Sequence, residues 1–384
     1  MQDRNLPSPE SQYGNPSTVS NALCASSAGV TAPDFFGEPF RPRRPFLGGH
    51  AQTIAGNFLP RRNALPPPEE RLFHVEPEAQ VLCHCHWQAD RRGGLTLLVV
   101  HGLEGSSDSP CVIGLGSKAW CAGMNVVRMN VRNCGGTERL GPTLYNSGLS
   151  ADVGAVAQTL IAQEKLPKLA LAGFSMGGNM VLKLLGEWGR QAPPQIKAGI
   201  GISPAIDLAV SADALHDLAN RIYEARFLWS LRQRMKRKAA RYPHIYDLRY
   251  LRGVRSLREF DDQITARYCG FRDADDYYDR AASSHVLDRI TVPTLVLHAT
   301  DDPFIRLLPD TRTKLLHNPN ITYFETRDGG HCAFLADSNG YDGRWAERQA
   351  IAFLQRVERG EPVRTPISIG DESPGSVDSR ETIR

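Results

Sequence analysis

The stretch of sequence that decides the fold is LALAGFSMGGNMVLKLLGEW, residues 169–188. It begins with an apolar run, 169–172, that is typical of a buried strand, and it ends with residues 178–188, which are typical of a helix. Between them lies the G-x-S-x-G pentapeptide GFSMG (173–177). In a strand, sharp turn and helix, this pentapeptide forms a nucleophile elbow, because its glycines remove side chains that would collide in the turn. We therefore predict that Ser175 is a nucleophile at the carboxyl edge of a sheet.

Two further apolar runs place an acid and a histidine after this serine. Residues 293–299 lead into the pair Asp301 and Asp302, and residues 321–325 lead into a Gly-Gly-His sequence that ends at His331. The chain order serine, acid, histidine is that of α/β-hydrolases and differs from that of chymotrypsin and subtilisin. Each candidate follows a strand, and open α/β sheets collect their sites at the carboxyl ends of strands. The pattern predicts a catalytic triad.

An early strand supplies a candidate oxyanion hole. The apolar run 95–100 leads into HGLEG, residues 101–105. An H-G turn in this place resembles the oxyanion loop of the fold, in which the residue after the glycine presents its N–H. We expect the backbone N–H groups of Leu103 and Met176 to bind the oxyanion. One such donor can be worth about 2.7–4 kcal/mol in the transition state.

The whole chain limits the classes of function. Its 384 residues are enough for one large domain with an insertion or for two domains, and 41% hydrophobic with 23% charged residues excludes global disorder. A net charge of +3 is too small to argue for nucleic acid as a partner. No apolar run approaches the roughly 18 residues of a membrane span, and the N-terminus does not look like a secretory signal. We expect a cytoplasmic protein without a transmembrane segment.

The eight cysteines are scattered, and several fall in expected strands or helices, as buried free thiols do. This supports a reducing compartment. The sequence CHCH at 83–86 looks like a metal cluster, but in a strand its cysteines would face one side and its histidines the other. Tetrahedral zinc needs four converging ligands, so we expect no metal site, and no cofactor is implied.

The remaining elements alternate between strands and helices, which predicts an α/β fold: a mostly parallel sheet with helices on both faces. Ser109 is expected to cap a helix whose first residue is Pro110. The expected strands lie near 72–75, 81–87, 95–100, 125–131, 169–172, 198–202, 293–299 and 321–325, and the expected helices near 110–122, 150–164 and 178–188.

Composition divides the chain into a domain and two tails. Residues 1–33 and 359–384 are rich in small and polar residues and are expected to be disordered. The domain itself is expected over 34–358. Its Pro- and Arg-rich beginning, up to residue 68, is expected to wrap the domain surface, on its own subunit or on a neighbour.

Between about 207 and 288 the alternation stops, and a helix-like, basic insertion is expected to form a cap over the site. Two interpretations stay open. Phe227, Leu228 and Trp229 could bind acyl chains while the cations of the cap face anionic headgroups, or the basic residues could form a solvated helical face. Contact with a membrane surface therefore stays open as well.

These residues together resemble the YheT-like α/β-hydrolases, a group of predicted esterases related to lipid-acting abhydrolase-domain proteins of animals. The resemblance covers about residues 40–358. It rests on the sequences PFLGGHAQTI (45–54), HGLEGSS (101–107), NVRNCGG (130–136), the elbow at 173–177, DDPF (301–304) and GGH (329–331).

The resemblance implies a Ser-Asp-His triad that falls on Ser175, Asp302 and His331. Asp302 is preferred over Asp301 because the acid in this fold commonly precedes such a turn, and Asp301 would then hydrogen-bond the loop; the choice stays open. The chain departs from the family at Asn146, where histidine is usual, which leaves the triad unaffected. We also expect it to lack the N-terminal membrane helix of the animal relatives.

The implied reaction is hydrolysis of a carboxylic ester through an acyl-enzyme on the serine. The substrate would be a small-molecule or lipid ester, so a carboxylesterase and a lipase or phospholipase are both open, and a non-catalytic binding protein on the same fold is the third alternative. We expect structural roles for His50, His101 and Arg132. Phe174 and Phe334 are expected in the core or along the acyl pocket. The oligomeric state is not readable from the sequence.

Overall fold

The structure is a computed structural model that describes residues 35–338 and 340–363. The predicted N-terminal tail and residues 364–384 of the predicted C-terminal tail lie outside the described residues, whereas Arg359, where that tail was expected to begin, is the last residue of a helix. An eight-stranded sheet runs through the molecule in the order β1-β2-β4-β3-β5-β6-β7-β8. The strands are β1 (Glu69–Glu76), β2 (Ala79–His86), β3 (Thr96–Val100), β4 (Asn125–Met129), β5 (Leu169–Phe174), β6 (Ile196–Ile202), β7 (Thr294–Ala299) and β8 (Ile321–Thr326).

The sheet confirms the predicted fold class. Strands β1 and β2 pair antiparallel, as do β2 and β4, and the strands from β4 through β3 to β8 are parallel. Every residue of β3, β4, β5 and β7 is buried. Parallel strands become continuously apolar in this way when helices cover both of their faces.

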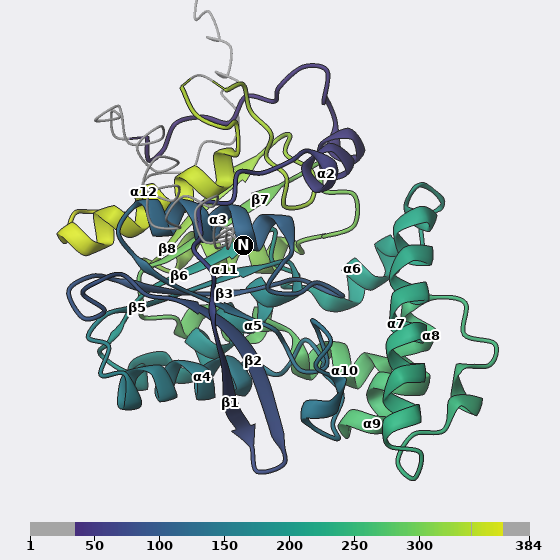
Figure 1. Cartoon of the computed structure of the whole chain (residues 1–384). Helices are drawn as coiled ribbons and strands as arrows, with labels where there is room; N and C mark the ends of the chain where they lie inside the picture. The colour runs from purple at the N-terminus through teal and green to yellow at the C-terminus, as the bar shows by residue number, and fades with distance from the viewer. Residues whose placement is uncertain (1–34, 339, 364–384) are drawn as a thin grey trace, which may run out of the picture.

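Helices cover the two faces in separate groups (Figure 1). Helices α3 (Pro110–Cys121) and α12 (Trp345–Arg359) pack together on one face, where they bury one apolar cluster. Helices α4 (Ser150–Gln163) and α5 (Met176–Trp188) cover the other face, and α11 (Pro309–His317) packs beside β8. The carboxyl edge of the parallel strands is left for the loops that carry the predicted site residues.

The predicted N-cap position of Ser109 is confirmed, although its side chain does not cap the helix. Ser109 occupies the N-cap position and Pro110 begins the helix, but the serine side chain accepts no hydrogen bond from the helix. Its hydroxyl instead accepts from the backbone N–H of Ser106, at 3.0 Å. The hydroxyl oxygen of Ser109 therefore stabilises the loop before the helix and not the first turn of the helix.

The N-terminal arm packs on its own chain. Phe35 and Phe36 are buried in the cluster under α12. A helix that sequence analysis did not expect, α2 (Gly49–Phe58), follows. Its buried Gln52 donates to the carbonyl of Leu335 at 3.1 Å and accepts from the N–H of the same residue at 2.7 Å. The arm is thereby tied to the loop that follows β8.

The cap insertion lies between β6 and β7 and stands beside the sheet in Figure 1. Its helices are α6 (Leu208–Leu215), α7 (Arg221–Arg241), α8 (Leu257–Phe260), α9 (Arg267–Cys269) and α10 (Ala274–Ala281), with a π-helical turn at Asp261–Ala266.

Part of the basic sequence of α7 is buried against the core domain. The guanidinium of Arg234 pairs with Glu104, with Nε 2.8 Å from Oε1. The ammonium of Lys238 donates to the carbonyls of Glu138, at 3.1 Å, and Gly141. Neither expected interpretation describes these two cations, because they face neither headgroups nor solvent: they attach the cap to the domain.

Over the described ranges, the helices lack the combined length and hydrophobicity that a bilayer crossing requires. In β2 the CHCH sequence alternates as expected: Cys83 and Cys85 are buried in the core, while His84 lies 3.1 Å from the hydroxyl of Ser107 and the ring of His86 accepts from Arg128. Six described cysteines are free thiols, and Cys121 is disulfide-bonded, so the expectation of free thiols does not hold for every cysteine.

Candidate active site

Ser175 lies in a strained turn between β5 and α5. Its backbone has φ 54° and ψ −120°, a conformation that costs a non-glycine residue about 1–3 kcal/mol. A Cβ at Gly173 would lie 2.1 Å from the carbonyl oxygen of Gly177, and a Cβ at Gly177 would lie 2.4 Å from the carbonyl oxygen of His101. The turn therefore has the geometry of an elbow, and only glycine fits on its two flanks.

We predict that Gly173→Ala destabilises the protein by about 3 kcal/mol or more, because the added methyl group would collide with backbone atoms that cannot move aside. Urea denaturation of both proteins measures the difference. Gly123→Ala is the matched control, since nothing lies within 4 Å of a Cβ there and the penalty comes from its φ of 83° alone, about 1 kcal/mol. Equal losses in the two variants would contradict the close contact at the elbow.

The predicted oxyanion donors lie beside the serine. Leu103 and Met176 line the same pocket as Ser175. Within the part of the chain that the structure describes, no protein acceptor takes the backbone N–H of either residue. Glu104 holds the loop: its carboxylate pairs with Arg234 and accepts from the hydroxyl of Tyr145 at 2.6 Å. The donors are thus available, and the loop that carries one of them is fixed.

His101 has a structural place in this loop, as expected. Its Nε2 accepts from the N–H of Val131 at 3.0 Å, and its Nδ1 lies 2.7 Å from the carbonyl oxygen of Gly102. Burial lowers the pKa of His101 to about 4, so the ring is neutral at ordinary pH. A neutral ring with both nitrogens engaged joins the ends of β3 and β4.

The base and the acid of the predicted triad are in contact. Nδ1 of His331 lies 2.8 Å from Oδ2 of Asp302. Asp302 is fully buried, and its other oxygen, Oδ1, accepts from the N–H groups of Phe304 at 3.1 Å and Ile305 at 2.9 Å. Burial alone raises the pKa of Asp302, but the His331 ring and these donors hold the pKa below its ordinary value. The carboxylate is therefore ionised and aimed at the histidine.

Asp301, the alternative acid, faces elsewhere. Its Oδ1 accepts from the N–H of Gly330 at 2.8 Å, and burial raises its pKa to about 6. Its hydrogen bond therefore holds the loop that carries His331. Helix α2 holds the same loop, because the hydroxyl of Thr53 accepts from the N–H of His331 at 2.9 Å. Sequence analysis missed Thr53 as a residue of the site, although it lies within the PFLGGHAQTI sequence that carried part of the resemblance.

The predicted nucleophile and base are not joined by a hydrogen bond in the structure. Among the described residues, no hydrogen bond links Ser175 Oγ to the ring of His331. Nε2 of that ring lies 3.7 Å from the sulfur of Cys332, to which sequence analysis gave no role. The carbonyl oxygen of Ile202 accepts from the N–H of Ser175 at 3.0 Å and lies 3.6 Å from the same sulfur. Hydrogen bonds of catalytic groups are often long without substrate and shorten in the complex.

A pocket of about 940 Å³, including its open mouth, extends from Ser175 into the cap. Most of its lining is apolar. Phe227 takes part in it, whereas Leu228 is buried elsewhere in the core and Trp229 is 63% exposed. Phe174 and Phe334 lie in the core. The structure also brings in polar residues that sequence analysis did not consider for the site: Ser147, Asp261, Thr265, Tyr277 and Tyr278.

The other singled-out residues lie around this centre. Nδ1 of His50 lies 3.1 Å from the hydroxyl of Tyr223, and the rings of Phe304 and His331 have centroids 4.3 Å apart. Arg132 makes a bidentate pair with the buried carboxylate of Asp152. Neither His50 nor Arg132 has a hydrogen bond to Ser175 among the described residues.

Comparison with known proteins agrees with this architecture. Residues 96–338 match the family described as alpha/beta hydrolase fold. The protein named "Putative esterase YheT" of Escherichia coli is 32% identical, over 82% of this chain and 92% of its own. Phospholipase ABHD3 of Mus musculus is 29% identical over 68% and 62% of the two chains.

Among solved structures, the 2,6-dihydroxy-pseudo-oxynicotine hydrolase superposes with a TM-score of 0.54 at 17% identity, over 82% of this chain and 74% of its own, which shows the likeness of fold alone. The resemblance stated from the sequence motifs is thereby confirmed. By its match over residues 96–338 and its likeness to the Escherichia coli protein, this chain belongs to the α/β-hydrolase fold family.

Proposed function

We propose that the protein is a serine esterase that hydrolyses carboxylic esters through an acyl-enzyme on Ser175. The observation that carries the proposal is the contact between His331 and Asp302 past the strand ends, and a strained serine that lines a largely apolar pocket supports it. The esterase named among the relatives supports the same reaction class. No cofactor takes part in the proposed reaction.

In the first half of the reaction, Oγ of Ser175 attacks the ester carbonyl carbon while Nε2 of His331 takes the hydroxyl proton. The N–H groups of Leu103 and Met176 bind the oxygen that becomes negative. When the tetrahedral intermediate collapses, His331 gives the proton to the leaving alcohol, and the acyl group stays on the serine. For this exchange Nε2 has to turn from its contact with the sulfur of Cys332, which lies 3.7 Å away, to Oγ of Ser175.

In the second half, a water molecule attacks the acyl carbon while His331 takes one of its protons. The carbon–Oγ bond then breaks, His331 returns the proton to Oγ, and the carboxylic acid leaves. Asp302 holds the proton on Nδ1 throughout and stabilises the imidazolium cation that forms twice. The burial of Asp302 and its backbone donors suit a carboxylate that is never protonated in the cycle.

Covalent labelling tests the proposal directly. A fluorophosphonate should react once with the purified protein, at Ser175, as shown by mass spectrometry of the labelled peptide. Ser175→Ala should lose the label while its circular dichroism and melting temperature stay unchanged. Intact, folded protein that resists the reagent would favour the non-catalytic alternative instead.

The pH dependence of kcat/KM should show a raised histidine pKa. Burial lowers the pKa of His331, but the neighbouring Cys332 sulfur and the Asp302 carboxylate offset this and leave it well above its ordinary value of 6.5. Only the neutral ring can accept a proton, so activity is lost as the pH falls through this pKa. With a neutral ester between pH 5 and 10, the midpoint of the rising limb should lie above about 6.5. A midpoint below that value would contradict the ion pair.

Lipid esters are the second candidate substrate class, because the pocket is largely apolar and the cap exposes large hydrophobic side chains. Leu218 and Ile222, at the beginning of the cap, are 86% and 72% exposed. A monoacylglycerol lipase of Saccharomyces cerevisiae is a 27% identical relative. Turnover of nitrophenyl esters of rising chain length, with phospholipid vesicles alongside, separates the classes. Preference for two to four carbons would exclude acyl lipids as the main substrate.

We further propose that the protein works in the cytoplasm, as its free thiols suggest. Six described cysteines are free, and four of them are raised in pKa by burial to about 11 or 12, which suits inert core thiols. The disulfide at Cys121 does not support this compartment. Fractionation of cells that carry the tagged protein decides the matter, and recovery outside the cytoplasmic fraction would overturn it.

A further inference from the structure

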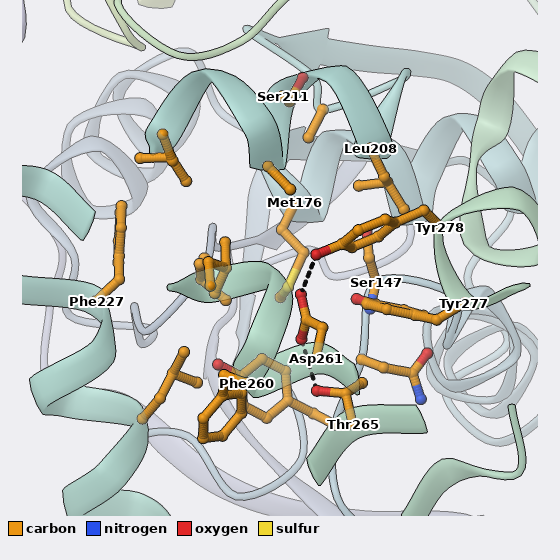
Figure 2. A pocket seen from close by; sticks show the side chains of 18 of the residues that line it. Ser147, Met176, Leu208, Ser211, Phe227, Phe260, Asp261, Thr265, Tyr277 and Tyr278 are labelled. Carbon is orange, nitrogen blue, oxygen red and sulfur yellow. Dashed lines mark hydrogen bonds between the residues drawn. The ribbon is translucent and has the colours of Figure 1, made fainter. Parts of the chain in front are cut away.

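One wall of the largely apolar pocket carries a hydrogen-bonded polar cluster. It consists of Asp261, Thr265 and Tyr278, which we call the Asp261 cluster (Figure 2). Oδ1 of Asp261 accepts from the hydroxyl of Thr265 at 2.7 Å, and Oδ2 accepts from the hydroxyl of Tyr278 at 2.8 Å. In the close-up, the side chain of Met176, the residue after the proposed nucleophile, points toward Asp261 and Tyr278.

The carboxylate of Asp261 is buried without a charged partner. Within the described ranges no Lys, Arg or His forms an ion pair with it, and its two donors are neutral hydroxyls. Arg258, the cation that acts on it from a distance, is already paired with Asp213 and Asp275. Burial raises the pKa of Asp261 to about 6. Because a carboxylate can accept about four hydrogen bonds, two acceptor positions remain.

The backbone under this cluster is also unusual. Asp261 and Thr265 belong to the π-helical turn Asp261–Ala266, which lies between α8 and α9. Single π-helical turns are rare and occur frequently at functional sites, because they re-aim side chains within a helix. Here the turn puts two polar side chains on the cavity wall, where apolar ones would pack at no cost in desolvation.

Hydroxyl donors lie on the same side of the pocket. The hydroxyl oxygen of Tyr277 accepts from the N–H of Ser147 at 3.0 Å, and the hydroxyl oxygen of Ser147 accepts from Nδ2 of Asn179 at 2.9 Å. In the described chain neither hydroxyl donates to a protein acceptor. Each therefore keeps its own hydrogen for a ligand. Figure 2 shows both side chains beside the Asp261 cluster.

We propose that the pocket selects esters whose buried part carries a hydroxyl group, and that this hydroxyl donates to Asp261 and accepts from Tyr277 or Ser147. The inference rests on the proposed function, since it names the substrate class of the same site. A plain alkyl chain would leave the carboxylate without its remaining donors. An ammonium group could donate to Asp261 but could not accept a hydrogen bond from Tyr277 or Ser147. A hydroxyl group can do both.

Matched ester pairs test this specificity. Ethyl 6-hydroxyhexanoate is compared with ethyl hexanoate, and 4-hydroxybutyl acetate with butyl acetate, so that the hydroxyl is placed once on the acyl side and once on the alcohol side. We expect kcat/KM, from acid release, to be about tenfold or more higher for the hydroxylated ester of at least one pair. Ethyl 6-aminohexanoate is the third arm, and it should not exceed its hydroxylated counterpart.

Variants connect the preference to the cluster. Asp261→Asn should lower the ratio of kcat/KM between the hydroxylated and the plain ester about fivefold or more. Asp262→Asn is the matched control, because Asp262 is the next residue of the same turn, lies outside the pocket lining and should leave the ratio unchanged. If Asp261→Asn does not fold, Tyr278→Phe removes one of the hydroxyls that hold Asp261 and should lower the same ratio.

The outcomes separate this inference from the proposed function. Turnover of plain esters that depends on Ser175, with no preference for a hydroxyl in either pair, would overturn the inference and leave the esterase proposal standing. A preference that survives in folded Asp261→Asn and Tyr278→Phe would overturn it too, as would a stronger preference for the amino ester. Absence of turnover of all five esters, together with absence of fluorophosphonate labelling, would instead reject the proposed function.

Discussion

Ser175→Ala is expected to lower kcat for ester hydrolysis by about 10⁶-fold, because the variant has no atom that can carry the acyl group. Its stability should stay close to that of the parent. Ser175 Oγ makes no hydrogen bond to the described residues, so its removal leaves no buried partner unsatisfied, and alanine keeps the same backbone strain. Initial rates on a nitrophenyl ester, together with thermal unfolding, measure both quantities.

The control for this variant is Ser117→Ala, the same substitution in α3 on the opposite face of the sheet. It reports contamination and general effects of a lost serine hydroxyl, and its kcat should stay within about threefold of the parent. A Ser175→Ala protein that keeps more than about one hundredth of the activity would refute the acyl-enzyme.

Asp302→Asn is expected to lower kcat about 10⁴-fold. The N–H groups of Phe304 and Ile305 both require an acceptor at Oδ1, so the amide oxygen of the variant must stay there. The amide nitrogen then takes the place of Oδ2 and donates to Nδ1 of His331. This moves the ring proton to Nε2, where the histidine can no longer accept the serine proton. Steady-state kinetics on the same ester measures the loss.

Asp301→Asn is the matched control, one residue away. Its amide oxygen can still accept from Gly330, and Oδ2 of Asp301 has no partner among the described residues, so an amide nitrogen disturbs little. A loss in kcat below about tenfold is expected. If Asp301→Asn were the more damaged variant, the acid would be Asp301, the alternative that the sequence left open.

The fold was readable from the sequence because its parallel strands are buried on both faces. Runs such as 95–100 and 169–172 are continuously apolar for that reason, and strands β3 and β5 lie within about two residues of them. The elbow was readable because glycines at 173 and 177 are a steric requirement of the turn. Which residues carry the chemistry stays a prediction, although Asp302 and His331 do lie in contact.

What the sequence could not supply depends on contacts between distant segments. Helix α2 was missed because its role comes from packing: Thr53 meets the histidine loop 278 residues later. Arg234 and Lys238 looked like surface charge, since their partners lie about 100 or more residues away. Asp261 was invisible for the same reason, because only the folded cap turns it toward the pocket.

The ion pair between Glu104 and Arg234 affects how substrate can enter the pocket and how product can leave it. Glu104 directly follows Leu103, and both members of the pair are nearly shielded from solvent. If the cap insertion moved away from the domain as a rigid lid, Glu104 and Arg234 would each lose a buried partner of opposite charge, which costs roughly 3–5 kcal/mol. We therefore expect substrate to enter and product to leave through rotamer changes of side chains at the mouth of the pocket. The long helix α7 would stay in place and hold the loop that carries Leu103.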